Sequence, residues 1–158
     1  MIIALYPGSF DPITNGHLDI ARRSAAIFDK VVMGVYDRPY NKNLMFTIEE
    51  RIKLAREAVA DILNVDVQPY SYLTVDFARS IGARVIVRGL RMSPDFEHEF
   101  EIAVMNRKLA PDLDMVCFMA SVDYQFLSSS LLKEVAQLDG TLENMVPENV
   151  ARALKAKL

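Results

Sequence analysis

Short apolar runs alternate with longer amphipathic stretches from one end of the chain to the other. The short runs are almost continuously apolar, which is typical of parallel strands covered on both faces. In the stretches between them, apolar positions recur at the three- and four-residue spacing of a helix. The pattern therefore predicts a βαβα order. Its strands are expected at residues 2–6, 31–36, 65–68, 85–87 and 115–119.

Capping signals mark where several helices begin and end. Thr47 and Glu50 form a capping box in front of one apolar helical stripe. Ser93 followed by Pro94 predicts an N-cap and a first-turn proline for another helix, which should stop before Pro111. These signals place the helices between the expected strands, as the alternating pattern requires.

Glycines stand where the backbone is expected to turn. Gly82 and Gly140 are placed to close two further helices as C-terminal caps. Gly8 and Gly16 lie in the loop after the first strand, where they are expected to let the backbone turn sharply and approach a ligand.

Strands joined in this way most simply form one doubly wound, Rossmann-like α/β domain over residues 1–158, with helices on both faces of a parallel sheet. We expect the strand order 3-2-1-4-5. In this order strands 1 and 4 are neighbours where the winding reverses, and ligands bind outside their carboxyl ends. The unusual loops YPGSFDPITNGH and RGLR follow these two strands, so both should border the crevice. The segment SSSLLKEVA should add hydroxyl groups beside them.

Composition narrows the classes of function. A net charge of -3 gives no general attraction to nucleic acid or to an anionic membrane, so neither is expected as a partner. The single cysteine, Cys117, lies in the apolar run MVCFMA and is expected to be a buried, inert thiol. No basic flank or long apolar segment precedes MIIALY, which favours a cytoplasmic protein. No cluster of Asp, His or Cys has the spacing of a protein metal site.

The loop GSFDPITNGH has a composition suited to binding phosphate, because a helix start offers unpaired N–H groups and a positive dipole end to an anion. It is neither the glycine fingerprint of dinucleotide-binding folds nor a Walker loop, and neither motif occurs elsewhere in the chain. Side chains must therefore supply more of the phosphate contacts. His17 is the candidate, with capping of the helix as the alternative role.

The string Thr14-Asn15-Gly16-His17 matches the T/H-x-G-H signature of the nucleotidyltransferase superfamily. Together with MFTIEERI, VRGLR, DFEHEFE and SSSLLKEVA, it resembles the bacterial phosphopantetheine adenylyltransferases over essentially the whole length. The superfamily often has an arginine where this chain has Lys133, and lysine keeps the charge but not the bidentate geometry, so Lys133 receives no role here.

The resemblance implies transfer of AMP from ATP to 4′-phosphopantetheine, giving dephospho-CoA and pyrophosphate in the penultimate step of coenzyme A synthesis. The acceptor phosphate is already an anion, so we expect in-line attack on the α-phosphorus without a covalent enzyme intermediate. Magnesium should arrive with ATP, held largely by phosphate oxygens and water. The resemblance also implies a homohexamer, and CoA is a further possible ligand.

The resemblance assigns roles to individual residues. His17 is expected to stabilise the transition state by donating a hydrogen bond to the α-phosphate, and Lys42 and Arg91 are expected to assist it. The implied ATP contacts are Ser9, Phe10, His17, Gly89, Leu90, Arg91, Glu99, Tyr124, Gln125, Phe126, Leu127, Ser128, Ser129 and Ser130. The implied acceptor contacts are Ser9, Lys42, Thr74 and Arg88.

Two other functions fit parts of the pattern. One is an adenylyl- or cytidylyltransferase of the same fold that uses another acceptor, such as nicotinamide mononucleotide or a sugar-alcohol phosphate. The segment NKNLMFTIEER, Thr74 and RGLR favour phosphopantetheine. The other is a regulatory nucleotide-binding module without catalysis, which would need neither His17 nor Lys42.

Overall fold

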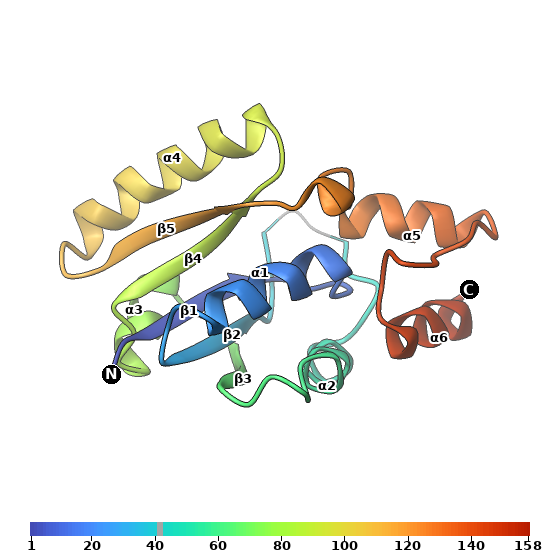
Figure 1. The fold of residues 1–158 in the computed structure, drawn as a ribbon, viewed down its shortest axis with the longest axis horizontal. Coiled ribbons are helices and arrows are strands. Elements are labelled where there is room, and N and C mark those ends of the chain that lie inside the picture. Colours follow the sequence, from blue (N-terminus) through green and yellow to red (C-terminus); the bar gives the residue numbers. More distant parts are fainter. Residues whose placement is uncertain (41–42) are drawn as a thin grey trace.

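The computed structural model describes residues 1–40 and 43–158, and its ribbon shows strands and helices alternating along the chain (Figure 1). The strands are β1 (Ile3–Gly8), β2 (Lys30–Tyr36), β3 (Val65–Tyr70), β4 (Val85–Leu90) and β5 (Asp114–Met119). The helices are α1 (Asn15–Ala25), α2 (Ile48–Ala58), α3 (Thr74–Ser80), α4 (Ser93–Leu109), α5 (Ser129–Gln137) and α6 (Glu148–Lys157), with a short 3-10 turn at Val122–Tyr124.

The strands form one parallel sheet in the order β3-β2-β1-β4-β5, which confirms the predicted topology. Alternate side chains of each inner strand enter opposite cores. Ala4 and Tyr6 of β1 belong to a large core shared with α1, α2, α5 and α6. Leu5 belongs to a smaller core against α3 on the other face. Both faces of the central strands are therefore covered, as their continuous apolar sequences require.

The pairing of β1 with β4 is short. It joins Ala4 to Val85 and Leu5 to Ile86, whereas β1 pairs with β2 from Ile3 to Gly8. The strands β1 and β4 thus separate toward their carboxyl ends. This separation opens the predicted crevice at the point where the winding of the sheet reverses.

The helix caps agree with the sequence at α2 and differ slightly at α4. Thr47 and Glu50 form both hydrogen bonds of the predicted capping box. The predicted N-cap at Ser93 is wrong by one residue: Met92 is the N-cap, Ser93 is the first helical residue, and no side chain caps the helix. The helix nevertheless ends at Leu109, before Pro111, as predicted.

The two predicted glycine caps differ in how they work. Gly82 follows α3 with φ of 70°, the left-handed conformation expected of a C-terminal cap. After α5 that conformation falls on Asp139, with φ of 54°. The N–H of Gly140 then donates to the carbonyl of Val135 at 2.9 Å, which completes a Schellman motif. Glycine is required there because a Cβ would lie 2.5 Å from Val135 Cγ1.

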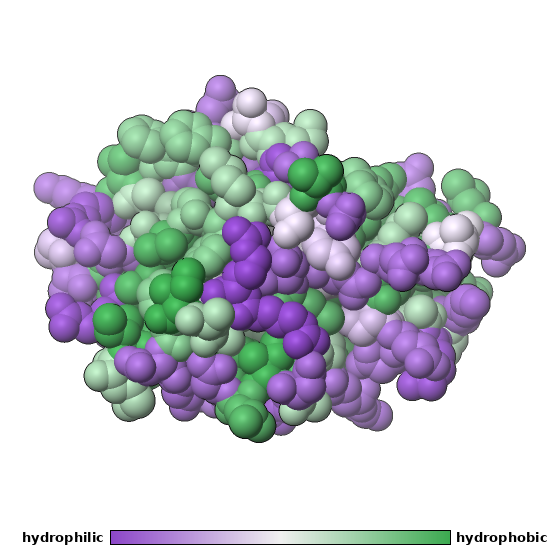
Figure 2. All heavy atoms as spheres, in the orientation of Figure 1, coloured by the Kyte–Doolittle hydropathy of each residue, from purple (hydrophilic) through white to green (hydrophobic). Residues whose placement is uncertain are grey.

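The predicted burial of Cys117 is wrong, because Cys117 is exposed. It lies on β5, an edge strand that shows most of its side chains to solvent. Many apolar side chains of the neighbouring helix α4 are likewise exposed. The buried residue of this helix is Glu99. In Figure 2, hydrophobic atoms gather over the part of the surface formed by α4. The exposed apolar side chains of α4 and β5 include Phe96, Phe100, Val104, Met105, Leu109, Val116 and Met119.

In the described residues, no helix is long and apolar enough to span a membrane.

Candidate active site

A cavity of about 550 Å³ lies at the carboxyl ends of β1 and β4. It is bordered by the β1–α1 loop, the end of β4, the start of α4 and the start of α5. The predicted site residues that line it are Ser9, Phe10, His17, Arg88, Gly89, Arg91, Glu99, Tyr124, Leu127, Ser128, Ser129 and Ser130. The structure therefore brings together residues from four separate parts of the sequence.

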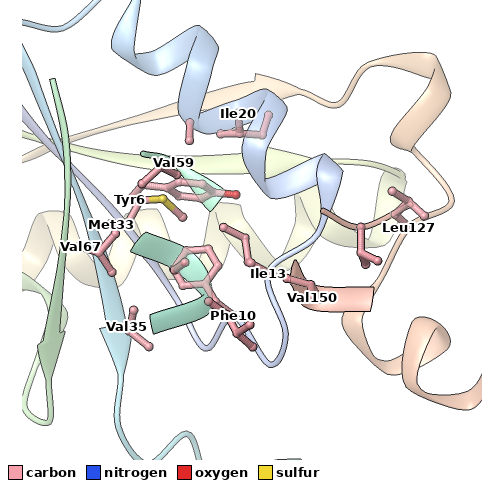
Figure 3. Packing of buried hydrophobic residues seen from close by; sticks show 14 of the residues in the cluster. Tyr6, Phe10, Ile13, Ile20, Met33, Val35, Val59, Val67, Leu127 and Val150 are labelled. Atoms are coloured by element: carbon pink, nitrogen blue, oxygen red, sulfur yellow. The ribbon is translucent and has the colours of Figure 1, made fainter. Parts of the chain in front are cut away.

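The β1–α1 loop is anchored by apolar side chains that point into the large core. Phe10 is 2% exposed and Ile13 is fully buried, and Figure 3 shows both within the cluster that contains Val35 and Val150. Phe10 has a φ of 46°, a left-handed conformation that costs a non-glycine residue about 1–2 kcal/mol. Burial of the ring holds this conformation. The ring is directed inward, so ligand contacts at this position fall to the backbone.

The turn in this loop does not use the glycines as predicted, since Phe10 and not Gly8 or Gly16 adopts the left-handed conformation. Gly8 is needed for a different reason: a Cβ there would lie 2.9 Å from the ring of Phe10. Gly16 lies in the first turn of α1, where a Cβ would make ordinary contacts.

His17 both caps α1 and lines the cavity. Thr14 is the N-cap residue and accepts a hydrogen bond from the backbone N of His17, while the His17 ring accepts one from the backbone N of Thr14. The acceptor atom is Nδ1, at 3.0 Å. Because Nδ1 accepts a backbone N–H bond, the proton of the neutral ring must lie on Nε2. Helix capping and a role in the cavity are thus compatible.

Arg88, which is partly buried, forms an ion pair with the buried Glu99 at the end of β4. Arg88 Nε and Nη2 donate to the two Glu99 oxygens at 2.8 and 2.6 Å, and Nη1 donates to the carbonyl of Pro7 at 2.9 Å. Burial alone would lower the pKa of Arg88, but the Glu99 hydrogen bonds and charge outweigh it and raise that pKa. The pair joins β4 to β1 across the crevice and to α4.

Arg91 connects the end of β4 to the segment before α5. Its Nε donates to Asp95 Oδ2 at 2.9 Å and its Nη1 donates to the carbonyl of Leu127 at 2.7 Å. Burial tends to raise the pKa of Asp95, and the hydrogen bonds from Arg91 more than offset it, so that pKa is lowered. The arginine is therefore fixed at the cavity wall and is not a flexible surface side chain.

The N-terminus of α5 opens onto the cavity. Ser128 is its N-cap and accepts from the backbone N of Leu131 at 3.1 Å. Ser129 Oγ donates to the carbonyl of Pro12 at 2.8 Å, which ties α5 to the β1–α1 loop. Residues at the starts of both α1 and α5 line the same cavity, where the positive ends of the helix dipoles favour an anion.

Several predicted contacts do not line the cavity. Leu90 is buried in β4, Gln125 donates to the carbonyl of Ala120, and Phe126 is exposed. Thr74 begins α3, and its hydroxyl pairs with that of Tyr70 at 3.1 Å. Lys42 lies outside the described residues.

The cavity wall also contains residues outside the predicted sets of ATP and acceptor contacts. Among these, Asp11 and Lys133 form an ion pair at 2.7 Å. Tyr6 is buried against the ring of Phe10, and burial raises the pKa of its phenol, so it stays neutral. The remaining lining residues are Pro7, Gly8, Thr14, Gly16, Ile20, Asn43, Leu44, Asp95 and Ala120. The sequence signals for this group were the loop glycines, the motif that contains Thr14, and the segment SSSLLKEVA, which contains Lys133.

The acidic side chains of the lining are all paired. Within residues 1–40 and 43–158, Asp11 pairs with Lys133, Asp95 with Arg91 and Glu99 with Arg88. No group of three or more His, Cys, Asp or Glu side chains in this part of the chain could hold a metal ion.

Comparison with known proteins shows which family the chain resembles. The chain matches the family model described as Cytidylyltransferase-like over residues 5–135. A phosphopantetheine adenylyltransferase of Roseiflexus sp. (strain RS-1) is 57% identical over 155 residues, covering 98% of this chain and 96% of that protein. A phosphopantetheine adenylyltransferase of Thermomicrobium roseum is 53% identical over 156 residues, covering 98% of this chain and 93% of that protein.

A crystal structure from Vibrio parahaemolyticus, described as a nicotinate-nucleotide adenylyltransferase, has a TM-score of 0.70 and covers 98% of this chain and 99% of its own. Its sequence identity is 17%, so this likeness concerns the fold alone.

Proposed function

Because this chain belongs to the phosphopantetheine adenylyltransferases, within the wider Cytidylyltransferase-like family, we propose that it transfers AMP from ATP to 4′-phosphopantetheine. The products are dephospho-CoA and pyrophosphate, in the penultimate step of coenzyme A synthesis. The observation that carries the proposal is His17: its ring lines the cavity, and its Nδ1 contact leaves the proton on Nε2.

The reaction is a single in-line displacement. An oxygen of the acceptor phosphate forms a bond to the α-phosphorus of ATP as the bond from that phosphorus to the bridging oxygen breaks. Pyrophosphate leaves with the electron pair, and no proton has to be removed from the attacking phosphate. The enzyme therefore acts by holding two anions together and by stabilising the charge that grows on the α-phosphate oxygens.

The His17 Nε2–H group donates a hydrogen bond to an oxygen of the α-phosphate. The dipoles of α1 and α5, whose first turns line the cavity, supply further partial positive charge to the same anions. Arg91 is fixed by Asp95 and Leu127 at the wall and supports the nucleotide side. The resemblance assigns the acceptor side to Ser9, Lys42, Thr74 and Arg88.

Magnesium enters bound to ATP. The carboxylates of the described wall are engaged by Lys133, Arg91 and Arg88, so phosphate oxygens and water are the ligands that suit the ion. The ion neutralises charge on the departing pyrophosphate. CoA, which contains the skeleton of the product, is a further ligand for the same cavity, and ATP as the donor suits a cytoplasmic enzyme.

The proposed enzyme is a homohexamer. The support is the exposed apolar surface of α4 and β5, here called the α4–β5 face, with Phe96, Phe100, Val104 and Met119 each more than half exposed. Apolar surface of this kind is suited to contact with another copy of the chain.

The activity is tested by measuring pyrophosphate release from ATP and magnesium with each of several acceptors. We expect turnover with 4′-phosphopantetheine and rates at least about a hundredfold lower with nicotinate mononucleotide or glycerol phosphate, because the acceptor's remote contacts contribute to the rate. Turnover with one of the other acceptors alone would contradict the proposed substrate. Nucleotide binding without turnover on any acceptor would indicate the regulatory alternative.

A further inference from the structure

The Asp11 carboxylate lies in the cavity wall at a point where three segments of the chain meet. It is 3% exposed. Its Oδ2 accepts from the backbone N of Met45 at 2.9 Å, and its Oδ1 accepts from the backbone N of Phe46 at 2.9 Å. Oδ2 also accepts from Lys133 Nζ at 2.7 Å. Both oxygens are therefore engaged, so Asp11 is unsuited to act as a general base.

Lys133 completes the connection from the side of α5. Its side chain is 18% exposed, and Nζ also donates to the carbonyl of Asn43 at 3.4 Å. The ammonium thus joins the β1–α1 loop, the segment 43–46 and α5. If Lys133 turned toward a phosphate, Asp11 would remain as a buried, unpaired carboxylate close to other anions, which is strongly unfavourable.

Arg51 fixes the same region from the core side. It is 1% exposed and donates to four carbonyl groups, those of Phe46, Ser9, Tyr36 and Asp37. Asp37 and Phe46 are described residues on either side of the gap at 41–42, and Ser9 lies in the β1–α1 loop. Arg51 therefore attaches both sides to that loop. Asn43 and Leu44 from segment 43–46 line the cavity that His17 also lines, and Lys42 precedes Asn43 in the chain.

We propose that Asp11 and Lys133 form a buried latch that positions segment 43–46 for the acceptor phosphate, and that Lys133 acts through Asp11 and does not bind a phosphate itself. The kinetic part of this inference rests on the proposed function. Both are positioning residues: neither touches a reacting atom, and their effect reaches the substrate through the backbone at Asn43 to Phe46.

A double-mutant cycle of Lys133→Met and Asp11→Asn separates the latch from direct phosphate binding. Each single variant should lower kcat/KM for 4′-phosphopantetheine by about 10- to 100-fold and leave the KM for ATP within about threefold. In the Asp11→Asn background, Lys133→Met should cost less than about twofold more. An undiminished cost of Lys133→Met in that background would show a direct phosphate contact and overturn the latch.

Amide hydrogen exchange of Met45 and Phe46, followed by NMR on the unliganded protein, gives a readout that needs no activity. Both amides should exchange at least about tenfold faster in each single variant, because their acceptor is lost or released. Unchanged exchange in both variants would overturn the latch. If the variants exchange faster but the wild-type chain shows no adenylyl transfer, the proposed function fails and the latch stands.

Three further variants control for indirect effects. Lys155→Met removes an exposed lysine on α6 and should change neither readout. Lys133→Arg keeps a cation within reach of Asp11 and should restore most of the exchange protection and acceptor kcat/KM. If Lys133→Met does not fold, Lys133→Gln, which can still donate a hydrogen bond, should show the same changes at smaller size; no change in Lys133→Gln would overturn the latch.

Discussion

At the scale of single residues, His17 serves the fold and the proposed reaction through opposite edges of one ring. Nδ1 accepts from the backbone of Thr14 and completes the capping box, which orients the ring and fixes the proton on Nε2. The two roles are separable, because glutamine at the third helical position can complete a capping box but does not reproduce the imidazole.

Replacing His17 separately by alanine and by glutamine should distinguish the roles. Both variants should lose at least about a hundredfold in turnover, the usual cost of one transition-state donor, while ATP binding stays within about tenfold. Only the alanine variant should also lose about 1 kcal/mol of stability, because only it lacks the side-chain half of the capping box, the acceptor for the backbone N of Thr14. Turnover numbers and urea unfolding check this, and a nearly unchanged turnover number in His17→Ala would remove His17 from the mechanism.

Arg51 should be essential to the fold. Replacement by methionine keeps the apolar stem but leaves several buried carbonyl groups without donors, which we expect to cost about 3 kcal/mol or more. Lys53→Met, an exposed position on the same helix, should change stability by less than about 0.5 kcal/mol. Chemical unfolding of the pair is decisive: equal midpoints would show that the carbonyl contacts of Arg51 contribute nothing.

The sequence could predict His17 and not the residues that fix its surroundings. His17 lies in a short motif with a capping partner three residues away. Asp11 binds the backbone of Met45, 34 residues away, and Arg51 binds the backbone of Ser9, 42 residues away. Backbone groups carry no sequence signal, so such contacts become visible only once the chain is folded.

At the scale of elements, α5 presents its N-terminus to the cavity, and the serines at its start do two different things. Ser128 caps the helix, and Ser129 holds the helix against the β1–α1 loop. The capping role was readable from the sequence. The contact from Ser129 to Pro12 was not, because it joins residues 117 positions apart.

Ser128→Ala should weaken ATP binding as well as stability. Loss of the cap should cost about 1 kcal/mol and loosen the first turn of α5, so we expect the KM for ATP to rise about 3- to 10-fold. The matched control is Asn64→Ala, which removes hydrogen bonds to Ala25 and Phe28 before the start of β3, away from the cavity. It should lose similar stability without a change in the KM for ATP. A rise of similar size in both variants would mean that general destabilisation is responsible.

The strands and helix starts were predicted from periodicity and capping chemistry, since these depend on neighbours in the sequence. The order 3-2-1-4-5 followed from the handedness of the crossovers and is confirmed. Helix α6 was not predicted, although its Val150 and Leu154 are fully buried. The glycine predicted the end of α5 correctly, but the left-handed residue is Asp139 and not Gly140. Glycine in the sequence therefore locates a helix end only to within about one residue.

At the scale of the whole molecule, the error about Cys117 is informative. The apolar sequence of β5 predicted burial, yet within one chain the strand lies exposed beside an equally apolar α4. An apolar run predicts burial but does not say whether the burial is within one chain or against another chain. The structure of a single chain shows only the contacts within it. The α4–β5 face is therefore the surface that we expect another copy to cover.

Light scattering should show a hexamer for the wild-type chain at micromolar concentration. Phe100→Glu places a charge within the α4–β5 face at a side chain that is 59% exposed, so it should yield smaller species with an intact fold. Leu63→Glu, at an exposed residue after α2, should leave the assembly unchanged. A monomeric wild type would refute the assembly.

The central claim is that the cavity holds both anions at once, so that AMP passes from donor to acceptor in one step. It is tested most directly by the stereochemistry of transfer from ATP carrying a sulfur in place of one α-phosphate oxygen in a single known configuration. The account predicts inversion at the α-phosphorus in the dephospho-CoA product. Retention would require an adenylyl group bound to the protein between two displacements, and would contradict the account.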